Sequence, residues 1–533
     1  MKSEILLGDE AVGLGAIHAG LYKAYSYPGT PASEIMEYLI KASQKRKNFH
    51  ASWCVNEKVA YEEALGVSFA GRRSLVSMKH VGLNVAADPF MNSAVTGTNG
   101  GLVVAVADDP SMHSSQNEQD SRYYAHFAQV FCFEPSNPQE AYEMTRKAFD
   151  ISEKTNVPVM VRLVTRLSHS RSRVQPYPSQ KPDSIQYGKW EDWTLLPVNA
   201  RRRFKILVEK QPNLVELSNR SEFNSLTLNK KNSQLGIITS GIAYNYVLEN
   251  YLQNNAIPSL LKIGAYPLPA NLIQDLVRQV ETLLIVEEGY PFIEKNLRGQ
   301  FGISGKKIKG KLSGDLPLTG ELSPDLVRKA LEMPPYSTHF LEDSPLASRP
   351  PKLCQGCPHA DTFHALNEVL RSRSGANVFS DIGCYTLGAL PPYNAVHTCV
   401  CMGASVSMAK GGADAGVDPS IAVIGDSTFA HSGITPLLDA ARVKANMTVI
   451  ILDNEVVAMT GGQPTFASGE ELDRIARGVG VEEKHIRVIT PLPKNKEKNI
   501  RVMKEEIDYK GLSVIIASRE CVQEARKRKK KRG

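Results

Sequence analysis

The residues with the clearest chemical potential lie in the last quarter of the chain. An apolar run ends in Gly425, Asp426 and Ser427, and after a predicted helix of about ten residues a second run ends in Asp453 and Asn454. In a parallel sheet both strand ends lie at the carboxyl edge, where α/β proteins bind ligands. Asp426 and Asn454 could then offer oxygens to one Mg²⁺, and backbone N–H groups could face phosphates. The alternative is an ordinary turn, with Asp426 capping the helix.

Cysteines form a second group with possible chemistry. Four of the eight follow a pattern of a C-x2-C pair and two later residues: Cys354, Cys357, Cys384 and Cys521. Four thiolates can hold zinc or an iron–sulfur cluster, and a redox dithiol is a third possibility. Spacing alone does not choose among them. The other four are predicted to be buried core residues: Cys54, Cys132, Cys399 and Cys401.

Polar residues also follow predicted strands in the N-terminal part of the chain. Thr30 lies in the turn YPGTP, Glu57 opens a predicted helix in NEKVA, and His80 follows the strand SLVSM. The polar loop 106–124 contains His113. Taken alone, these are a turn residue, a helix-terminal acid and a solvated loop. Their place at strand ends makes the histidines and the loop candidates for the wall of a substrate pocket.

The elements that must position these residues alternate between short apolar runs and segments of helical period. The runs predicted as strands are SLVSM, GLVVAVADD, VPVMVRLV, LGIITSG, TLLIVEEG, IAVIGDS, MTVIILDN and LSVIIAS. This alternation predicts an α/β protein with mostly parallel sheets. At ~100 to 200 residues per domain, 533 residues correspond to three or four domains. The predicted divisions are α/β domains at 1–185, 231–343 and 344–525, an irregular crossover with one helix at 186–230, and a basic tail at 526–533.

Two arginines near the end of the strand VPVMVRLV have open roles. Arg162 and Arg166 could pair with a substrate carboxylate or with coenzyme A phosphates. Arginines near strand ends are more often surface residues, so the interpretation of both as surface residues also stays open.

The net charge of +7 belongs to the tail. Residues 526–532 read RKRKKKR, and without these seven of the 63 Lys and Arg, 56 bases face 56 acids. A neutral body argues against a nucleic-acid or membrane partner. No apolar run approaches the ~18 residues of a membrane span, and the N-terminus lacks a signal-peptide pattern. We therefore expect a cytoplasmic protein with reduced cysteines.

Several of these motifs resemble a known family. The stretch from Gly425 to Asn454 is similar to the thiamine diphosphate motif, with Ser427 in place of its second glycine, and EVVAMTGGQP is similar to a run in 2-oxoacid:ferredoxin oxidoreductases. From residue 5 to 522 the chain resembles the large subunit of indolepyruvate ferredoxin oxidoreductases. The motifs are, in order, YPGTP, NEKVA, MKHVGLNVAADP, DDPSMHSSQNEQDSR, LGIITSGIAYN, CQGCPH, DIGCYTLG, GDSTF and DNEVVAMTGGQP.

The resemblance implies a multidomain thiamine diphosphate-binding fold. Residues 1–185 would bind the pyrimidine and 344–525 the diphosphate, around a transketolase C-terminal-like domain at 231–343. Glu57 would hold the aminopyrimidine, Thr30 would contact the oxoacid, and the histidines at 80 and 113 would line its pocket. The residues assigned to the cofactor and its Mg²⁺ are Gly425, Asp426, Ser427, Asn454, the carbonyl of Val456, His359 and Gly383.

The implied reaction is oxidative decarboxylation of an arylpyruvate to an acyl-coenzyme A. Electrons would leave through a 4Fe-4S cluster, held by the four patterned cysteines, to ferredoxin or a similar carrier. A smaller beta subunit and a dimer or heterotetramer are expected, with the active site at a domain interface. Another 2-oxoacid, a non-oxidative thiamine decarboxylase and a non-catalytic binding subunit are the alternatives.

The resemblance also has one departure. The family's large subunit continues into a ferredoxin-like domain, whereas here twelve residues follow Cys521. Electrons would then pass from the cluster directly to a separate carrier, or the activity is not linked to ferredoxin. The basic tail is expected to be a disordered, solubilising segment, or else a segment that recruits an acidic electron carrier.

Overall fold

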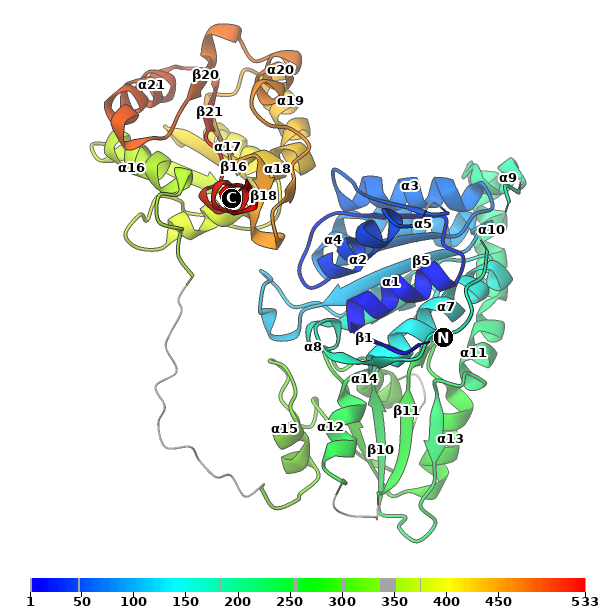
Figure 1. Ribbon diagram of the computed structural model, residues 1–533. Coiled ribbons are helices and arrows are strands. Elements are labelled where there is room, and N and C mark those ends of the chain that lie inside the picture. Colours follow the sequence, from blue (N-terminus) through cyan, green and yellow to red (C-terminus); the bar gives the residue numbers. More distant parts are fainter. Residues whose placement is uncertain are drawn as a thin grey trace. The chain divides into compact units, whose positions relative to one another are not determined.

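The structure is a computed structural model, and it falls into two compact units, Met1–Phe340 and Leu341–Gly533 (Figure 1). The residues it describes are 2–46, 48–181, 184–186, 188–252, 257–299, 303, 305–335, 351–373 and 375–532. Each unit is built of sheets covered by helices, and each is described separately below.

The larger sheet of the first unit has seven strands in the order β12-β6-β7-β5-β4-β2-β3. Neighbouring strands are parallel except β12, which is antiparallel to β6. The strands are β2 (Lys23–Ser26), β3 (His50–Trp53), β4 (Ser74–Lys79), β5 (Leu102–Asp108), β6 (Phe131–Phe133), β7 (Val159–Val164) and β12 (Ala265–Tyr266). Because β4, β5 and β7 are buried along their whole length, their sequences are mostly apolar, as predicted, with a few buried polar residues such as Lys79 and Arg162.

Helices cover both faces of this sheet, in a doubly wound arrangement (Figure 1). One core cluster includes residues of α1 (Gly8–His18), α2 (Ser33–Ser43) and α7 (Pro138–Thr155). The other includes residues of α3 (Glu57–Phe69) and α5 (Ala87–Thr96). Shorter elements complete this part: β1 (Glu4–Leu7), α4 (His80–Val85), α6 (Arg122–Phe127), α8 (Thr165–Ser168) and β8 (Arg171–Val174).

A second, five-stranded sheet follows in the order β14-β13-β10-β11-β9. Its strands are parallel except β9. The elements are β9 (Ser225–Thr227), β10 (Leu235–Ser240), α12 (Ala243–Glu249), β11 (Ser259–Ile263), α13 (Ala270–Gln279), β13 (Thr282–Val286), α14 (Phe292–Arg298), β14 (Lys307–Lys309) and α15 (Pro324–Ala330). Strand β12 directly follows β11 but pairs with the larger sheet, so one segment joins both sheets.

The prediction of a single helix between the two sheets is wrong. The segment forms α9 (Trp190–Trp193), α10 (Pro197–Glu209) and α11 (Gln211–Asn219). Proline lies in the first turn of both α10 and α11, where its missing N–H costs nothing. Pro212 therefore lies in the first turn of a new helix that follows Lys210.

The second unit has a fully parallel sheet in the order β15-β16-β17-β21-β20. Core clusters lie on both of its faces. The elements are α16 (Pro358–Leu370), β15 (Asn377–Ser380), α17 (Ala404–Asp414), β16 (Ser420–Gly425), α18 (Asp426–Thr428), α19 (Ile434–Arg442), β17 (Met447–Asp453), β18 (Val456–Val457), β19 (Gln463–Pro464), α20 (Glu470–Gly478), β20 (Ile486–Ile489), α21 (Lys496–Asp508), β21 (Leu512–Ser518) and α22 (Val522–Arg532). Helix α22 contains most of the basic tail, so the expectation of a disordered tail is wrong.

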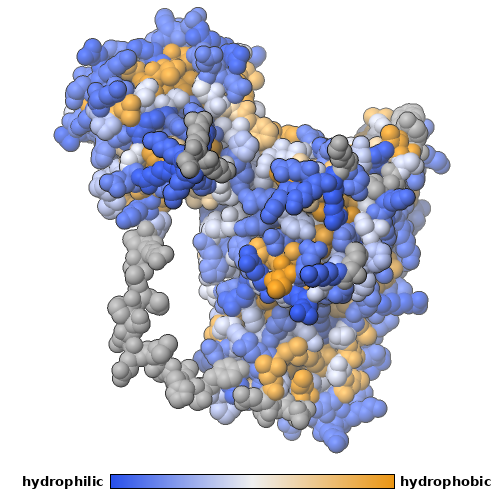
Figure 2. Space-filling view, viewed as in Figure 1, coloured by the Kyte–Doolittle hydropathy of each residue, from blue (hydrophilic) through white to orange (hydrophobic). Residues whose placement is uncertain are grey.

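The face drawn in Figure 2 is largely hydrophilic, and apolar side chains gather in a few separate patches. Across the described residues, no helix combines the length and the apolar character that a membrane crossing needs. The apolar residues are used mainly in the cores around the three large sheets.

Candidate functional site

Asp426 and Asn454 lie at the carboxyl ends of the adjacent parallel strands β16 and β17, as predicted. Asp426 accepts hydrogen bonds from the backbone N–H groups of Ser427 (2.7 Å) and Glu455 (2.8 Å). Burial, and then the nearby Asp453, raise the pKa of Asp426 well above its usual range. A bound cation would relieve this cost, because it favours the ionised carboxylate. The buried carboxylate therefore fits a metal ligand.

Asn454 connects this carboxylate to other predicted cofactor residues. Its Oδ1 accepts from the N–H of Val456 (3.1 Å), and its Nδ2 donates to Nε2 of His359 (3.1 Å). Burial, and then Arg519, lower the pKa of His359 to about 4, so the ring is neutral and can accept this bond. Carboxylate, amide and backbone carbonyl oxygens are the donors that Mg²⁺ prefers.

Two predicted glycines pack against one aromatic ring. A Cβ on Gly383 would lie 2.3 Å from the Tyr385 ring, and a Cβ on Gly425 would lie 2.7 Å from it. Both backbones therefore approach Tyr385 more closely than any other residue type allows. The helical run that begins at Asp426 contains a π-turn at Phe429–Gly433 and is longer than the sequence predicted.

The four patterned cysteines line one cavity of about 310 Å³ in the second unit. His359 and Asn454 line the same cavity, so the thiols adjoin the residues of the metal motif. The backbone N–H of Cys521 also donates to the carbonyl of Asn454 (3.1 Å). The fold thus brings Cys354 and Cys521, which are far apart in the sequence, to the same cavity.

One of these thiols, Cys384, is strongly affected by burial and by its neighbours. Burial, and then Cys357, Cys521 and Cys354, raise the pKa of Cys384 to about 12. Gln523 donates from Nε2 to Sγ of Cys354 at 3.1 Å. Among the described residues, no group of three or more His, Cys, Asp or Glu is arranged to hold a metal ion.

The prediction for the other four cysteines is half right. Cys54 and Cys132 are buried, whereas Cys399 and Cys401 are exposed. The last two lie in a loop before α17, so the apolar neighbours in their sequence do not bury them.

In the first unit, Glu57 and Lys79 mark the carboxyl edge of the larger sheet. Glu57 is 5% exposed and follows Asn56, whose side chain caps α3. A Cβ on Gly82 would lie 2.6 Å from Oε1 of Glu57, so the backbone of α4 packs on this carboxylate. Burial lowers the pKa of Lys79 to about 8, although Asp109 and Glu57 oppose the shift.

The loop between β5 and α6 contacts this edge, and its two ends are buried, whereas Met112, His113, Ser114 and Gln116 in its middle are exposed. Its Ser114 donates to the carbonyl of Thr30 (3.3 Å) and accepts on its carbonyl from Lys79 Nζ (2.7 Å). His80 is buried and donates from Nε2 to the carbonyl of Asn117 in the loop (3.1 Å). His113 has a half-exposed side chain, 3.5 Å from Glu321. Thr30 and His80 are thus brought to the loop, with His113 on its outer side.

A buried charge network, which the sequence did not predict, holds both ends of this loop. Arg162 pairs with Asp108 (2.7 Å) and Glu134 (2.5 Å), and Arg122 pairs with Asp120 (2.5 Å). Burial tends to raise the pKa of Asp120, but the two guanidinium groups lower it to about 2. The surface interpretation is therefore wrong for Arg162.

Arg166, four residues after Arg162, has a half-exposed side chain and pairs with Glu321 (2.5 Å).

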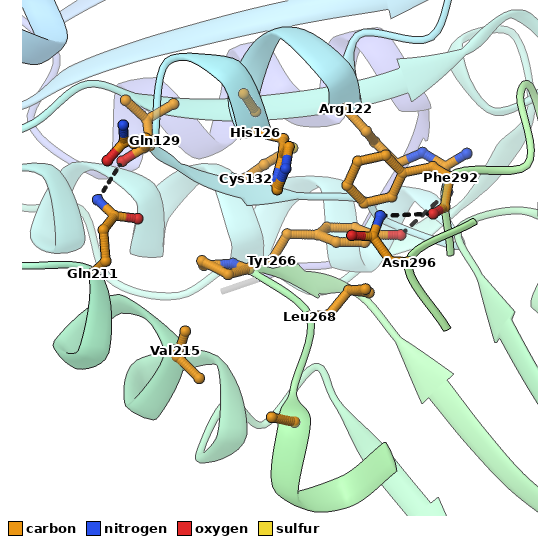
Figure 3. Close-up of a pocket in the computed structure, with 14 residues that line it drawn as sticks. Arg122, His126, Gln129, Cys132, Gln211, Val215, Tyr266, Leu268, Phe292 and Asn296 are labelled. Carbon is orange, nitrogen blue, oxygen red and sulfur yellow. Dashed lines mark hydrogen bonds between the residues drawn. The ribbon is translucent and has the colours of Figure 1, made fainter. Parts of the chain in front are cut away.

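A second cavity, of about 230 Å³, lies beside this network in the first unit (Figure 3). The rings of Tyr266 and Phe292 form one side of it, 5.8 Å apart, and the guanidinium of Arg122 lies 5.2 Å from the Phe292 ring. Gln211 donates to the carbonyl of Gln129 at 3.0 Å on the other side. The residues predicted for catalysis do not line this cavity.

Two family models match the chain, one in each unit. Residues 14–199 match the model described as pyruvate flavodoxin/ferredoxin oxidoreductase, thiamine diphosphate-binding. Residues 381–517 match the C-terminal binding domain of thiamine pyrophosphate enzymes. With the fold and the two strand-edge sites, these matches define a thiamine diphosphate-dependent enzyme of the 2-oxoacid oxidoreductase class.

Relatives narrow the assignment. The chain is 39% identical to the indolepyruvate oxidoreductase subunit IorA of Archaeoglobus fulgidus over 544 residues, which covers 97% of this chain and 86% of the relative. It is 39% identical to the IorA subunit of Methanothermobacter marburgensis over 539 residues, with the same coverage. The chain belongs to the IorA family of indolepyruvate oxidoreductase subunits.

More distant matches agree with the fold. The chain is 27% identical to the 2-oxoglutarate synthase subunit KorA of Methanocaldococcus jannaschii over 181 residues, 33% of this chain and 49% of the relative. The solved 2-oxoglutarate:ferredoxin oxidoreductase of Magnetococcus marinus, with 2-oxoglutarate, coenzyme A and succinyl-CoA bound, matches with a TM-score of 0.52 at 16% identity. That match covers 62% of this chain and 65% of the other.

Proposed function

We propose that this subunit oxidatively decarboxylates an arylpyruvate of the indolepyruvate type to an acyl-coenzyme A, and that the electrons leave through a 4Fe-4S cluster to a ferredoxin-like carrier. The observation that carries the proposal is the single cavity lined by Cys354, Cys357, Cys384 and Cys521 together with Asn454. It supports an electron acceptor directly beside the metal motif. Cysteine thiolates are the usual ligands of iron–sulfur clusters, and four of them line this cavity of about 310 Å³.

Thiamine diphosphate, when bound, supplies the electron sink that decarboxylation needs. In the proposal Asp426, Asn454 and the Val456 carbonyl hold its Mg²⁺ through oxygen ligands. The other residues assigned to the cofactor are Gly425, Ser427, His359 and Gly383. The buried Glu57 side chain would form a hydrogen bond to the pyrimidine ring of the cofactor.

The substrate side of the proposal uses the loop over the larger sheet. Thr30 and His80 would contact the oxoacid from the strand ends, and His113 would lie at the entrance. Coenzyme A is the acyl acceptor. The loop is held at both ends by buried ion pairs, which supports a fixed wall and not a flexible one.

The proposal includes a smaller second subunit, because the relatives are named as subunits, and a dimer or heterotetramer. It also places the enzyme in the cytoplasm. None of the eight cysteines forms a disulfide, which is the state that a reducing compartment maintains.

The test is anaerobic purification with the partner subunit, followed by iron, sulfide and zinc analysis and turnover assays. We expect acceptor reduction with indolepyruvate or phenylpyruvate that depends on coenzyme A. Cys521→Ser should lower the iron content, and Cys401→Ser, at an exposed cysteine outside the cavity, should not. CO₂ release without iron or acceptor reduction would instead indicate a non-oxidative decarboxylase. Turnover with pyruvate or 2-oxoglutarate alone would indicate another 2-oxoacid.

A further inference from the structure

The C-terminal helix α22 begins at the cysteine cavity. Gln523, Glu524 and Lys527 line that cavity together with the four cysteines. Gln523 donates to Sγ of Cys354, and Lys527 donates to the carbonyl of Gly461 (3.3 Å). Figure 1 shows the helix end-on beside β18, in the same unit. The start of the basic tail is therefore fixed to the cavity wall.

The positive charge of the chain is concentrated on this helix. Residues Arg526 to Lys530 are all exposed. Ion pairs join Lys527 to Glu524 (2.6 Å) and Arg528 to Glu520 (3.0 Å), so acids offset part of the charge near the cavity. Outside residues 526–532, bases and acids are equal in number, 56 of each. A strong local positive field beside a neutral body attracts and orients an acidic partner.

We propose that α22 is the docking surface for an acidic one-electron carrier protein, which collects electrons at the cysteine cavity. This inference rests on the proposed function. There, one 2-oxoacid and one coenzyme A thiol give one acyl-coenzyme A, one CO₂, one proton and two electrons. Two oxidised carrier molecules take one electron each, one after the other. Docking on α22 brings the carrier to the wall of the cavity that holds the donor.

The composition of α22 favours a protein partner over a membrane. An interfacial helix needs an apolar face, and the sequence VQEARKRKKKR offers Val522 and Ala525 alone, both in its first turn. The position of the helix beside the cavity has no use for binding a nucleic acid. For a redox protein docked there, it shortens the distance over which the electron is transferred.

The experiment replaces Arg526, Arg528, Lys529 and Lys530 with Gln in the complete enzyme with its partner subunit. The matched control replaces four exposed bases of α21 with Gln, the same change in charge: Lys496, Lys498, Arg501 and Lys504. The measured quantity is kcat/KM for a purified acidic ferredoxin at low and at about 0.15 M ionic strength, beside turnover with methyl viologen.

We expect the α22 variant to lose at least about 10-fold in kcat/KM for ferredoxin at low ionic strength, through KM, with the loss shrinking as salt rises. The α21 control should keep the wild-type value, and viologen turnover should stay unchanged in both. Equal losses in the two variants, or no loss in either, would overturn the docking surface. The docking surface would also be overturned if the α22 variant kept its ferredoxin rates but lost binding to duplex DNA or to anionic vesicles. If wild-type enzyme reduces no viologen with any 2-oxoacid, the proposed function itself is wrong, whatever the tail does.

Discussion

Replacing Arg162 with Met should destabilise the first unit far more than a charge loss at the surface would. The Arg162 side chain is 0% exposed and pairs with Asp108 (2.7 Å) and Glu134 (2.5 Å), which are equally buried. Met fills much of the volume, so the main effect is that Asp108 loses its counter-charge and Glu134 keeps only its longer contact with Arg122 (3.8 Å). Breaking a buried pair in this way costs about 3 to 5 kcal/mol, a large part of the ~5 to 15 kcal/mol that stabilises a domain.

The chain provides both a matched control and a selective probe. Arg166→Met removes a partly exposed arginine four residues away, 44% exposed and paired with Glu321, and should cost about 0 to 1 kcal/mol. All three tryptophans, Trp53, Trp190 and Trp193, lie in the first unit. Tryptophan fluorescence in a urea titration at pH 7 therefore follows the unfolding of this unit alone.

The reasoning also predicts a partial rescue. Adding Glu134→Gln to Arg162→Met removes one of the two buried carboxylates that have lost Arg162, so the double variant should be more stable than Arg162→Met alone. The network is not a stabilising feature if Arg162→Met lowers the free energy of unfolding no more than Arg166→Met does. The same conclusion follows if Glu134→Gln lowers the free energy of unfolding of the Arg162→Met variant by as much as it lowers that of the wild type.

Two further substitutions test the strand-edge sites. Asp426→Asn should weaken Mg²⁺-dependent thiamine diphosphate binding, measured by calorimetry, by at least about 10- to 100-fold, whereas Asp439→Asn, at an exposed position of α19, should not change it. Gly82→Ala should displace the Glu57 carboxylate, since the new Cβ would lie 2.6 Å from it. Turnover should then fall without loss of α3, while Gly66→Ala, with open space around it, keeps full activity.

Much of the fold could be predicted from the sequence because its strands are buried on both faces. Runs such as SLVSM and MTVIILD have no solvent-facing positions, so they lack the polar alternation of a half-exposed strand and are easily detected as mostly apolar runs. Asp426 and Asn454 were predicted together for a related reason. They lie within one strand–helix–strand unit, where the spacing alone places both at the same sheet edge.

Features that depend on tertiary contacts were missed. Nothing near Lys210 in the sequence indicates that a second helix follows it. A proline at this point is compatible both with the end of one helix and with the first turn of another. Cys399 and Cys401 have apolar neighbours, yet the loop that carries them is exposed. The helical state of the tail is another case, since its first two turns are held by the contacts of Gln523 with Cys354 and of Lys527 with Gly461.

The polar loop after β5 shows the physical limit most clearly. A polar sequence indicates solvent only if its side chains find no partners in the protein, because a buried charge is tolerated once it is paired. Here the partners of Asp108 and Asp120 are arginines on β7 and at the start of α6, and Arg122 also pairs with Glu287, far along the chain. A single sequence carries the charges but not their pairing. The loop is therefore anchored at both ends by buried charges, while its middle, which includes Met112, His113 and Gln116, is exposed as its composition predicts.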